Sequence, residues 1–397
     1  MLNIKRGNAD IHNMKNYNYT GIITSINTNW FDFMQTINIS MQKNDTAIKS
    51  NMENEILEQP SIITELTKRY ITPEKYILIN LPLNIKKVVL IASGSSYHCG
   101  YITAELLKEY ANCDAECVYS SEFVLNKNIE TNKETLFVFI SQSGETSDTL
   151  DALKKVSKIT DKILCVTNNE DSTIWQLSNY KILTYAGKEH SIASTKAMSA
   201  QLFCLYLLVL KIMYSKNIDI QSEINYLHNI PTSLNHILED RKSITEIAKK
   251  LSKYQNISIL GSRAFYALAK EGALKIKETS YINTTAYPQG EFMHGHVAIL
   301  NQKSAVIALV DEENEALMIK NIQKIKADYS PFLIAISNSD NTNLEKYSNH
   351  NFRLSSETKI FAIFETLIML QLLALEIAKH LKRNIDRPTG LKKVVIN

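Results

Sequence analysis

The feature that most constrains the fold is a unit that recurs along the chain: an apolar segment, a polar loop, and a segment with helical spacing. Strands that alternate with helices at this spacing form parallel sheets with right-handed crossovers. Two series of such units follow each other. They predict an α/β fold with two parallel sheets, each flanked by helices in a three-layer α-β-α arrangement. The predicted strands cover residues 87–92, 136–140, 162–167 and 180–184, and then 257–260, 305–310 and 332–338.

The length and composition are those of a soluble globular protein. The 397 residues predict two domains, and 45% of them are apolar against 21% charged. The net charge of +3 gives no reason to expect binding to nucleic acid or to an anionic membrane. A long apolar helix is predicted over residues 360–379. Because Glu365, Gln371 and Glu376 interrupt it, we expect a core helix and not a membrane span.

The cysteines and the N-terminal segment indicate a cytoplasmic protein. The five cysteines are odd in number and form no Cys-x-x-Cys pair, which argues against a disulfide framework and against a zinc site. Residues 1–40 contain no charged leader followed by an apolar core and a cleavage site. We therefore expect a protein of the reducing cytoplasm.

One polar loop in the first half has the chemistry of a phosphate site. Ser141-Gln-Ser-Gly-Glu-Thr-Ser-Asp-Thr149 follows a buried strand and precedes a helix. Gly144 lets the backbone turn, and the helix directs free N–H groups and the positive end of its dipole at the loop. A simple capping turn needs one or two Ser, Thr or Asp residues, whereas this loop has six in nine. An anion site, most simply for phosphate, is the better interpretation.

The corresponding loop of the second half is acidic. Asp311-Glu-Glu-Asn-Glu315 follows the strand predicted over residues 305–310, at the position of the hydroxyl-rich loop in the first half. Its carboxylates would repel a phosphate. We infer one phosphate site per chain, in the first half, and expect the second half to contribute other groups.

Those other groups are expected between residues 271 and 295. On a helix, Lys275 and Glu278 share one face, and His294 lies in a Gly-rich turn. Alone, the Lys–Glu pair could be a solvated ion pair, and His294 could be an ordinary loop histidine. At the end of a sheet that has a phosphate loop, however, a carboxylate and an imidazole can move protons between adjacent carbons and open a sugar ring.

Six motifs, in order and with similar spacing over about residues 50–397, resemble the tandem sugar-isomerase (SIS) domains of the glutamine:fructose-6-phosphate aminotransferases, the glucosamine-6-phosphate synthases. The resemblance implies two tandem SIS domains and a sugar-phosphate substrate. The motifs are Ser93-Gly-Ser-Ser-Tyr97, Ser141-Gln-Ser-Gly-Glu-Thr146, Ala193-Ser-Thr-Lys-Ala197, Glu271-Gly-Ala-Leu-Lys-Ile-Lys-Glu278, Gly290-Glu-Phe-Met-His-Gly295 and Asp386-Arg-Pro-Thr-Gly-Leu-Lys-Lys393.

The resemblance also implies roles for residues of the first half, which would bind the substrate. The sugar itself would be contacted by Ser95 and Ser194. The phosphate of the sugar would be held by Ser96, Ser141, Gln142, Ser143 and Thr146.

The implied catalytic residues come from the second half and the tail. Glu278 would be the base that moves a proton between C1 and C2, with Lys275 supporting it. His294 would open the sugar ring, reaching in from the neighbouring subunit of a homodimer. Lys393 would form a Schiff base with the keto sugar, as an amine near a carbonyl can. Without the resemblance, a solvated lysine in a basic tail is the simpler interpretation of Lys393.

The chain departs from the synthases in two places. Synthases begin with a glutaminase domain that carries an N-terminal nucleophilic cysteine, whereas residues 1–50 contain no cysteine and are too short for such a domain. We therefore expect that this chain does not make ammonia from glutamine. His296 also stands where the synthases have proline, which bears on the shape of the loop and not on the presence of the acid/base groups.

The favoured hypothesis is a SIS-type glucosamine-6-phosphate deaminase that forms fructose 6-phosphate and ammonia by C1/C2 proton transfer, with no metal and no nicotinamide cofactor. Three alternatives stay open. They are the ammonia-using isomerase subunit of a split synthase with a separate glutaminase, a fructosamine-6-phosphate deglycase, and a non-catalytic phosphosugar sensor. The presence of Glu278, His294 and Lys393 favours an enzyme. Residues 1–50 contain no helix-turn-helix with a basic face, which weighs against a sugar-sensing transcription factor.

The predicted organisation has six parts. They are an irregular leader over residues 1–50, an N-terminal helix over 51–77, a first SIS domain with the phosphate loop over 78–217, a helical connector over 218–252, a second SIS domain with the acid/base residues over 253–380, and a tail that closes the site over 381–397.

Overall fold

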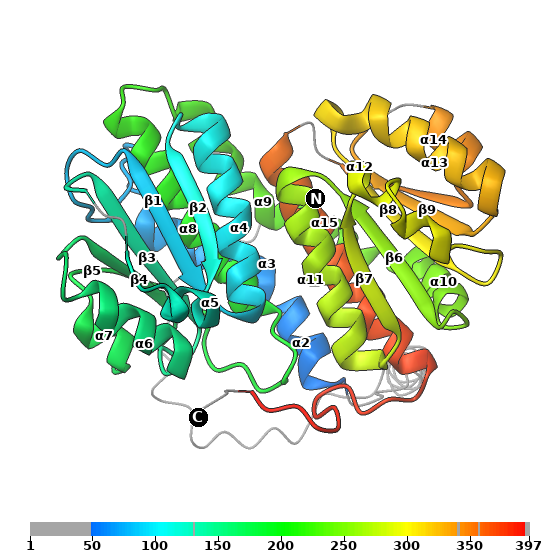
Figure 1. Cartoon of the computed structure of the whole chain (residues 1–397), viewed down its shortest axis with the longest axis horizontal. Helices are drawn as coiled ribbons and strands as arrows, with labels where there is room; N and C mark the ends of the chain where they lie inside the picture. Colours follow the sequence, from blue (N-terminus) through cyan, green and yellow to red (C-terminus); the bar gives the residue numbers. More distant parts are fainter. Residues whose placement is uncertain (1–48, 130–131, 340–341, 356–357, 394–397) are drawn as a thin grey trace, which may run out of the picture. The chain divides into compact units, whose positions relative to one another are not determined.

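The computed structural model describes residues 49–129, 132–339, 342–355 and 358–393 (Figure 1). The leader predicted over residues 1–50 therefore lies outside the described residues, apart from its last two. Residues 50–397 form one unit, which contains two five-stranded parallel sheets. The predicted α/β class with two sheets, each flanked by helices, is confirmed.

The first sheet has the strand order β2-β1-β3-β4-β5, and all its neighbouring strands are parallel. Alternate side chains of its central strands are buried on opposite faces, as expected for a sheet covered on both sides. The strands are β1 (Lys87–Ala92), β2 (Asp114–Tyr119), β3 (Thr135–Ser141), β4 (Ile163–Thr167) and β5 (Tyr180–Leu183).

The helices of the first half fall into two groups. One face of the sheet packs against α5, α6 and α7, and the other packs against α4 and α8. Their bounds, with those of the N-terminal and connecting helices, are α2 (Asn51–Leu57), α3 (Gln59–Tyr70), α4 (Gly94–Tyr110), α5 (Ser120–Leu125), α6 (Ser147–Val156), α7 (Thr173–Leu177), α8 (Lys196–Ser215), α9 (Gln221–Glu239) and α10 (Lys242–Leu251).

The second sheet repeats the architecture, with the strand order β10-β9-β8-β6-β7 and parallel pairing throughout. Its strands are β6 (Asn256–Gly261), β7 (Asn283–Pro288), β8 (Ala305–Val310), β9 (Phe332–Ser337) and β10 (His350–Arg353). Its helices are α11 (Arg263–Ser280), α12 (Gln289–Phe292), α13 (Glu315–Tyr329), α14 (Thr342–Tyr347) and α15 (Lys359–His380), with 3₁₀ turns η1 (His296–Ile299) and η2 (Glu312–Asn314).

The two sheets share one central hydrophobic core. The inner faces of both sheets and the helices α4, α8, α11 and α15 belong to a single buried cluster, and α4 packs directly against α11 (Figure 1). Both α8 and α15 are long and apolar enough to span a membrane, but the most apolar stretch of α15 is entirely buried inside the protein. Burial explains their composition, and α15 is the core helix that the sequence predicted.

Three strands were not predicted, and all three are edge strands. They are β2 in the first sheet, and β7 and β10 at the two edges of the second sheet. The segments 93–97 and 261–265 have the composition of loops, but α4 begins at Gly94 and α11 begins at Arg263. The segment that begins at Ser120 is also helical, as α5. Serine and glycine are common at helix starts, which is why these residues resembled loops.

The C-terminal tail is fixed to the start of the described chain. The carboxylate of Asp386 accepts hydrogen bonds from the backbone N–H groups of Asn51 (2.9 Å) and Met52 (3.0 Å), and so caps helix α2. The carbonyl of Asp386 accepts from the N–H of Ile192 at 3.1 Å. The tail therefore lies beside the loop that precedes α8.

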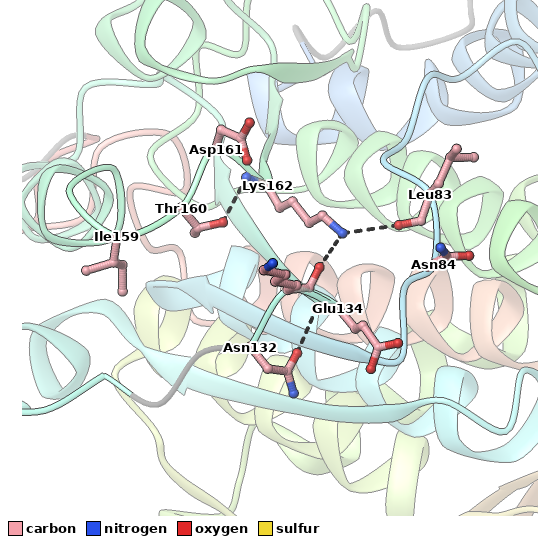
Figure 2. A pocket seen from close by; sticks show the side chains of 9 residues that line it. Leu83, Asn84, Asn132, Glu134, Ile159, Thr160, Asp161 and Lys162 are labelled. Carbon is pink, nitrogen blue, oxygen red and sulfur yellow. Dashed lines mark hydrogen bonds between the residues drawn. The ribbon is translucent and has the colours of Figure 1, made fainter.

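A cavity of about 730 Å³ lies at the amino ends of the first sheet, away from the polar loops (Figure 2). The cavity is lined by Lys162, whose ammonium group already donates hydrogen bonds to the carbonyls of Leu83 (3.1 Å) and Lys133. These contacts tie together the loops before β1, β3 and β4. We assign this cavity a structural role.

Candidate active site

The polar loops of the first sheet open into a cavity of about 340 Å³ at the carboxyl ends of its strands. Ligands of open parallel sheets bind at this edge. Helix α11 and the C-terminal tail complete the wall. The predicted site residues that line the cavity are Ser95, Ser96, Ser141, Gln142, Ser143, Thr146, Ser194, Lys275, Glu278 and Lys393.

The 141–149 loop is a tight turn whose hydroxyl groups are ordered by the backbone. The Ser141 hydroxyl accepts from the N–H of Gly144 and lies 3.1 Å from the Thr146 hydroxyl. Gly144 has a φ of +69°, and a Cβ at this position would lie 2.2 Å from the Ser172 hydroxyl oxygen. Only glycine fits such a position. The predicted turn at Gly144 is confirmed.

Two helix N-termini meet at the cavity. Helix α6 follows the loop, and its N-cap residue Thr146 makes no side-chain capping bond. Helix α4 begins at Gly94, and its N-cap residue Ser93 makes none either. Uncapped N–H groups and the positive ends of two helix dipoles therefore face a ring of hydroxyl groups, which is a favourable environment for an anion. The hydroxyl of Ser96 in α4 is held at 3.0 Å by Gln201 of α8.

A buried ion-pair network forms the opposite wall. The ammonium group of Lys275 lies 2.6 Å from a Glu278 oxygen and 3.5 Å from a Glu271 oxygen. Lys275 is 1% exposed, so the alternative of a solvated Lys–Glu pair is wrong. Burial alone would lower the pKa of Lys275, but the Glu271 and Glu278 carboxylates outweigh burial and raise it. Lys275 is therefore a fixed positive charge beside Glu278.

Glu271 is the fully buried member of this network. Its carboxylate accepts from the Ser95 hydroxyl at 3.0 Å and lies 2.6 Å from Nδ1 of His98. Burial would raise the pKa of Glu271, but the Lys275 ammonium, His98 and Ser95 together lower it. Glu271 is thus a carboxylate in the protein interior, and it connects α4 to α11.

The C-terminal tail brings Lys393 to the third side of the cavity. Its ammonium group pairs with the carboxylate of Glu189 and donates to the carbonyl of Ser191 at 2.7 Å. The other Glu189 oxygen accepts from the N–H groups of Thr195 (2.9 Å) and Ala197 (3.1 Å) at the start of α8. Lys393 is therefore not the freely solvated lysine of the simpler interpretation.

His294 is the one predicted site residue that does not line the cavity. It is exposed in the turn after α12, where its backbone N–H donates to the carbonyl of Glu291 at 2.9 Å. A role for this imidazole in the cavity of the same chain is not supported by its position. Its assignment to a neighbouring subunit stays a prediction.

Four polar residues of the site were not singled out from the sequence: His98, Gln201, Glu271 and Glu189. Gln201, Glu271 and Glu189 each contact a predicted site residue through their side chains, and His98 contacts Glu271. Glu271 had a detectable signal, because it lies four residues before Lys275 and therefore on the same helix face. The other three are brought in by tertiary packing and had no local signal.

The equivalent edge of the second sheet carries a different cavity, of about 300 Å³, lined by Asp311, Glu312 and Glu313. Its lysine, Lys359, is paired with Glu109 at 2.6 Å and with Glu313 at 3.0 Å. The excess of carboxylates agrees with the expectation that this half does not bind phosphate. Among the described residues, no group of three or more His, Cys, Asp or Glu could hold a metal ion.

Comparisons with known proteins agree with this architecture. The SIS domain model matches residues 83–211 and 250–377. The glutamine–fructose-6-phosphate aminotransferase of Caldanaerobacter subterraneus is 31% identical over 356 residues, which are 87% of this chain and 58% of that protein. The enzyme of Campylobacter jejuni is 33% identical over 351 residues, with the same two coverages of 87% and 58%. The chain thus spans less than two thirds of these relatives.

Solved structures show the same fold. The C-terminal domain of the Francisella tularensis glucosamine-fructose-6-phosphate aminotransferase superposes with a TM-score of 0.80 at 29% identity, covering 86% of this chain and 99% of that one. Tagatose-6-phosphate ketose/aldose isomerase of Escherichia coli has a TM-score of 0.72 at 17% identity, covering 89% and 98%, and at that identity shows the fold alone. The chain therefore belongs to the SIS-domain family, with two SIS domains in tandem.

Proposed function

We propose that this chain is an enzyme that interconverts glucosamine 6-phosphate and fructose 6-phosphate plus ammonia by proton transfer between C1 and C2. The observation that carries the proposal is the position of Glu278. Its carboxylate, held 2.6 Å from the buried Lys275 ammonium, lines the same cavity as the hydroxyl-rich loop that suits a phosphate. A base across from a phosphate anchor is what a sugar-phosphate isomerase requires.

In this proposal the phosphate binds between the N-termini of α4 and α6. Ser141, Gln142, Ser143 and Thr146 would donate hydrogen bonds to it, and Ser96 would do so by turning its hydroxyl proton from Gln201 to the phosphate. Anchoring the phosphate fixes the sugar chain, and Ser95 and Ser194 line the space that the chain would occupy. The binding energy of the phosphate is then used to orient the carbons that react.

The chemical steps would use the opposite wall. Glu278 takes a proton from one of the two adjacent carbons and returns it to the other, and the ammonium group of Lys275 stabilises the charge that moves onto the neighbouring oxygen. Lys393 would attack the C2 carbonyl of the keto sugar and release water as the Schiff base forms. To do so it must leave Glu189 and lose a proton, and the carboxylate of Glu189 is placed to receive that proton.

Two further elements complete the proposal. His294 of a second subunit would open the sugar ring, which makes the working unit a homodimer with shared sites. Ammonia would be released in the deaminase direction, with water consumed, or supplied by a separate glutaminase in the synthase direction. The synthase direction has its own support, because the relatives at 31% and 33% identity are isomerising aminotransferases.

The test is ammonia release from glucosamine 6-phosphate by the purified chain, with Glu278→Gln as the matched inactive variant. Release by the wild type and its loss in the variant would support the deaminase direction. If no ammonia is released, fructose 6-phosphate with ammonium and then fructosamine 6-phosphates are offered. Binding of phosphosugars without turnover of any of them would contradict an enzymatic function and leave a sensor.

A further inference from the structure

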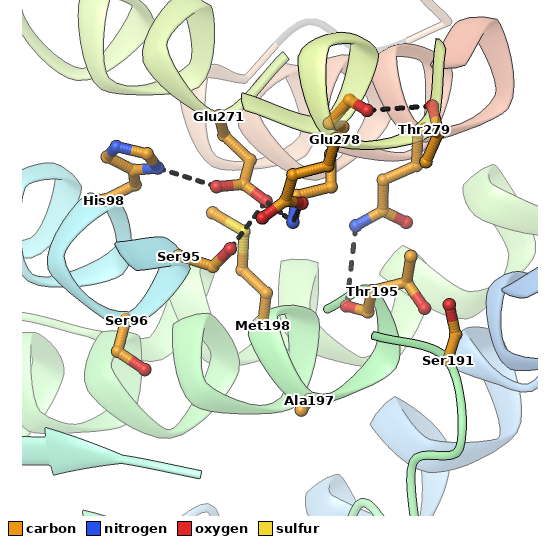
Figure 3. A network of polar contacts seen from close by, with 12 residues as sticks. Ser95, Ser96, His98, Ser191, Thr195, Ala197, Met198, Glu271, Glu278 and Thr279 are labelled. Atoms are coloured by element: carbon orange, nitrogen blue, oxygen red, sulfur yellow. Dashed lines mark hydrogen bonds and ion pairs between the residues drawn. The ribbon is translucent and has the colours of Figure 1, made fainter. Parts of the chain in front are cut away.

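His98 occupies a position beside the catalytic network that neither the motifs nor the proposed chemistry uses. It lies in the second turn of α4 and is 7% exposed. Its Nδ1 atom is 2.6 Å from Oε2 of Glu271 in α11, and the two side chains point at each other across the α4–α11 contact (Figure 3). The other oxygen, Oε1, faces Ser95 and Lys275.

The direction of the His98 hydrogen bond follows from the state of Glu271. Glu271 lies 3.5 Å from the Lys275 ammonium and accepts from the Ser95 hydroxyl, and these two contacts favour the carboxylate form despite burial. A carboxylate only accepts hydrogen bonds. Nδ1 of His98 must therefore carry the proton and donate it to Glu271, whatever the state of Nε2.

Hydrogen-bond donors and carboxylates then alternate in a row along α11. His98 donates to Glu271, Glu271 lies 3.5 Å from the Lys275 ammonium, and Lys275 lies 2.6 Å from Glu278. Lys275 is thus shared unequally between two carboxylates. Glu271 already accepts hydrogen bonds from His98 and Ser95. The Lys275 ammonium can therefore lie closer to Glu278 than to Glu271.

Two titratable neighbours of the His98–Glu271 pair are uncharged. Tyr97 and Cys99 flank His98 on α4, and burial raises the pKa of both above their ordinary values. Helix α8 contributes the apolar side chain of Met198 beside the pair (Figure 3). The charges nearest to the pair are Lys275 and, beyond it, Glu278, both on α11, and the Glu189 carboxylate of the 187–195 loop also acts on Lys275.

We propose that His98 is a positioning residue that acts on Glu278 through Glu271 and Lys275, and that it sets the lower end of the pH range in which Glu278 works as a base. The inference rests on the proposed role of Glu278. Loss of the His98 donor leaves Glu271 short of one partner in a buried site, so Glu271 draws the Lys275 ammonium toward itself. Glu278 then loses part of its counter-charge and takes up a proton at higher pH.

The experiment follows exchange of solvent deuterium into the C1 and C2 positions of fructose 6-phosphate and glucosamine 6-phosphate by NMR, from pH 5.5 to 9. The wild type is compared with His98→Ala, which removes the donor, and His98→Asn, which keeps a neutral donor. His228→Asn is the matched control, because Nδ1 of His228 hydrogen-bonds with the Ile224 carbonyl (2.9 Å) of its own helix, α9, outside this network.

In His98→Ala we expect kcat for exchange to fall about tenfold to a hundredfold, the scale of a lost hydrogen bond to a buried charge, with KM for the sugar phosphate changed less than about twofold. The half-maximal point on the acid side should rise by roughly half to one pH unit. His98→Asn should recover part of kcat, and His228→Asn should match the wild type.

The outcomes separate the two proposals. A wild-type chain that exchanges deuterium, with a His98→Ala variant of unchanged acid-side midpoint, overturns the inference and leaves the proposed function standing. A rise in KM without a fall in kcat in His98→Ala also overturns the inference and leaves the proposed function standing, because His98 would then act in substrate binding. A wild-type chain that exchanges neither sugar overturns the proposed function and this inference together.

Discussion

The ammonium group of Lys393 pairs with one oxygen of Glu189, while the other oxygen of Glu189 caps the start of helix α8. One carboxylate thus connects the tail, the 187–195 loop and a core helix. Because the side chain of Glu189 is fully buried, these two sets of contacts replace the hydrogen bonds that water would otherwise supply.

Replacing Glu189 separates its two tasks. Glu189→Gln keeps an oxygen for the α8 cap but removes the charge that holds Lys393, so limited proteolysis should cut residues 381–393 faster than in the wild type. Glu189→Ala also removes the cap, and its free energy of unfolding in urea should be lower by a further 1–2 kcal/mol, roughly the value of an N-cap. Glu116→Gln, on an exposed pair with Lys87, is the control. Equal proteolysis of Glu189→Gln and the wild type would contradict this role.

Gly144 should not tolerate a side chain. Its φ of +69° and the 2.2 Å approach of a Cβ to the Ser172 hydroxyl mean that Gly144→Ala must displace the loop. We expect the Kd for a sugar phosphate, measured by calorimetry, to rise at least about tenfold, since the hydroxyl groups lose their convergence. Asp151→Ala, on the exposed side of α6, should bind like the wild type. Unchanged affinity of Gly144→Ala would show that the anion does not bind at this loop.

The Lys275–Glu271 pair predicts a specific pH dependence of stability. The folded-state pKa of Glu271 is lowered, so its contribution is present above the ordinary value of 4.5 and is lost as pH falls through the folded-state pKa. The pKa of Lys275 is raised, so its contribution is present at all pH values below its ordinary 10.5 and is lost only above that range.

Replacing Lys275 should therefore lower the free energy of unfolding most near neutral pH. In Lys275→Met, Glu271 is a buried carboxylate without its main counter-charge, and we expect a loss of about 3–5 kcal/mol in the free energy of unfolding at pH 7. The loss should shrink toward pH 4, because protonation of Glu271 relieves the unpaired charge. This loss is measured by urea unfolding at several pH values, with the wild type compared with Lys275→Met and with the double variant Lys275→Met/Glu271→Gln. A pH-independent difference would contradict the charge argument.

The proposed Schiff base at Lys393 can be trapped. Borohydride added with fructose 6-phosphate should reduce the imine and leave a stable sugar-phosphate adduct on one lysine. Mass spectrometry of peptides should find it on Lys393, and it should be absent from Lys393→Ala. The neighbouring Lys392 also lines the cavity. The Lys392→Ala variant therefore tests which of the two lysines reacts, and it should still carry the adduct on Lys393. Labelling of Lys392 or Lys275 in place of Lys393 would contradict the assignment.

A site shared between subunits can be tested by mixing two inactive chains. If His294 acts in the cavity of its partner, a dimer of one Glu278→Gln chain and one His294→Ala chain contains one intact site. Random re-association after denaturation should then restore about a quarter of the wild-type activity, because half of the dimers are mixed and each has one of two sites. If His294 worked within its own chain, mixing would restore nothing.

Most of the fold could be predicted from the sequence, because a buried parallel strand is recognisable as a short continuous run of apolar residues. Strands β1, β3, β8 and β9 are continuous apolar segments, and each was located to within a residue or so. Strand β7, Asn283-Thr-Thr-Ala-Tyr-Pro288, lies at the edge of the second sheet and is mostly polar, so it gave no such signal. The helix starts at Gly94 and Arg263 were hidden by residues that also suit turns.

The candidate site was predictable only in part, for a related reason. The hydroxyl-rich loop and the Lys275–Glu278 spacing are local patterns, and both residue sets line the cavity. The contact of His98 with Glu271 joins residues 173 apart, and that of Glu189 with Lys393 joins residues 204 apart. No short-range pattern encodes such pairs, because they arise when helices pack.

The cap that Asp386 places on helix α2 has a consequence for how the protein is made. Asn51 and Met52 leave the ribosome long before Asp386, which follows them by more than 300 residues. Ser50 supplies a local N-cap to this helix, but the second cap, from Asp386, is available only after residue 386 has been synthesised. The same tail carries Lys393 to the cavity. A nascent chain therefore cannot assemble its site early, and a chain truncated before residue 386 would lack both the cap and that lysine.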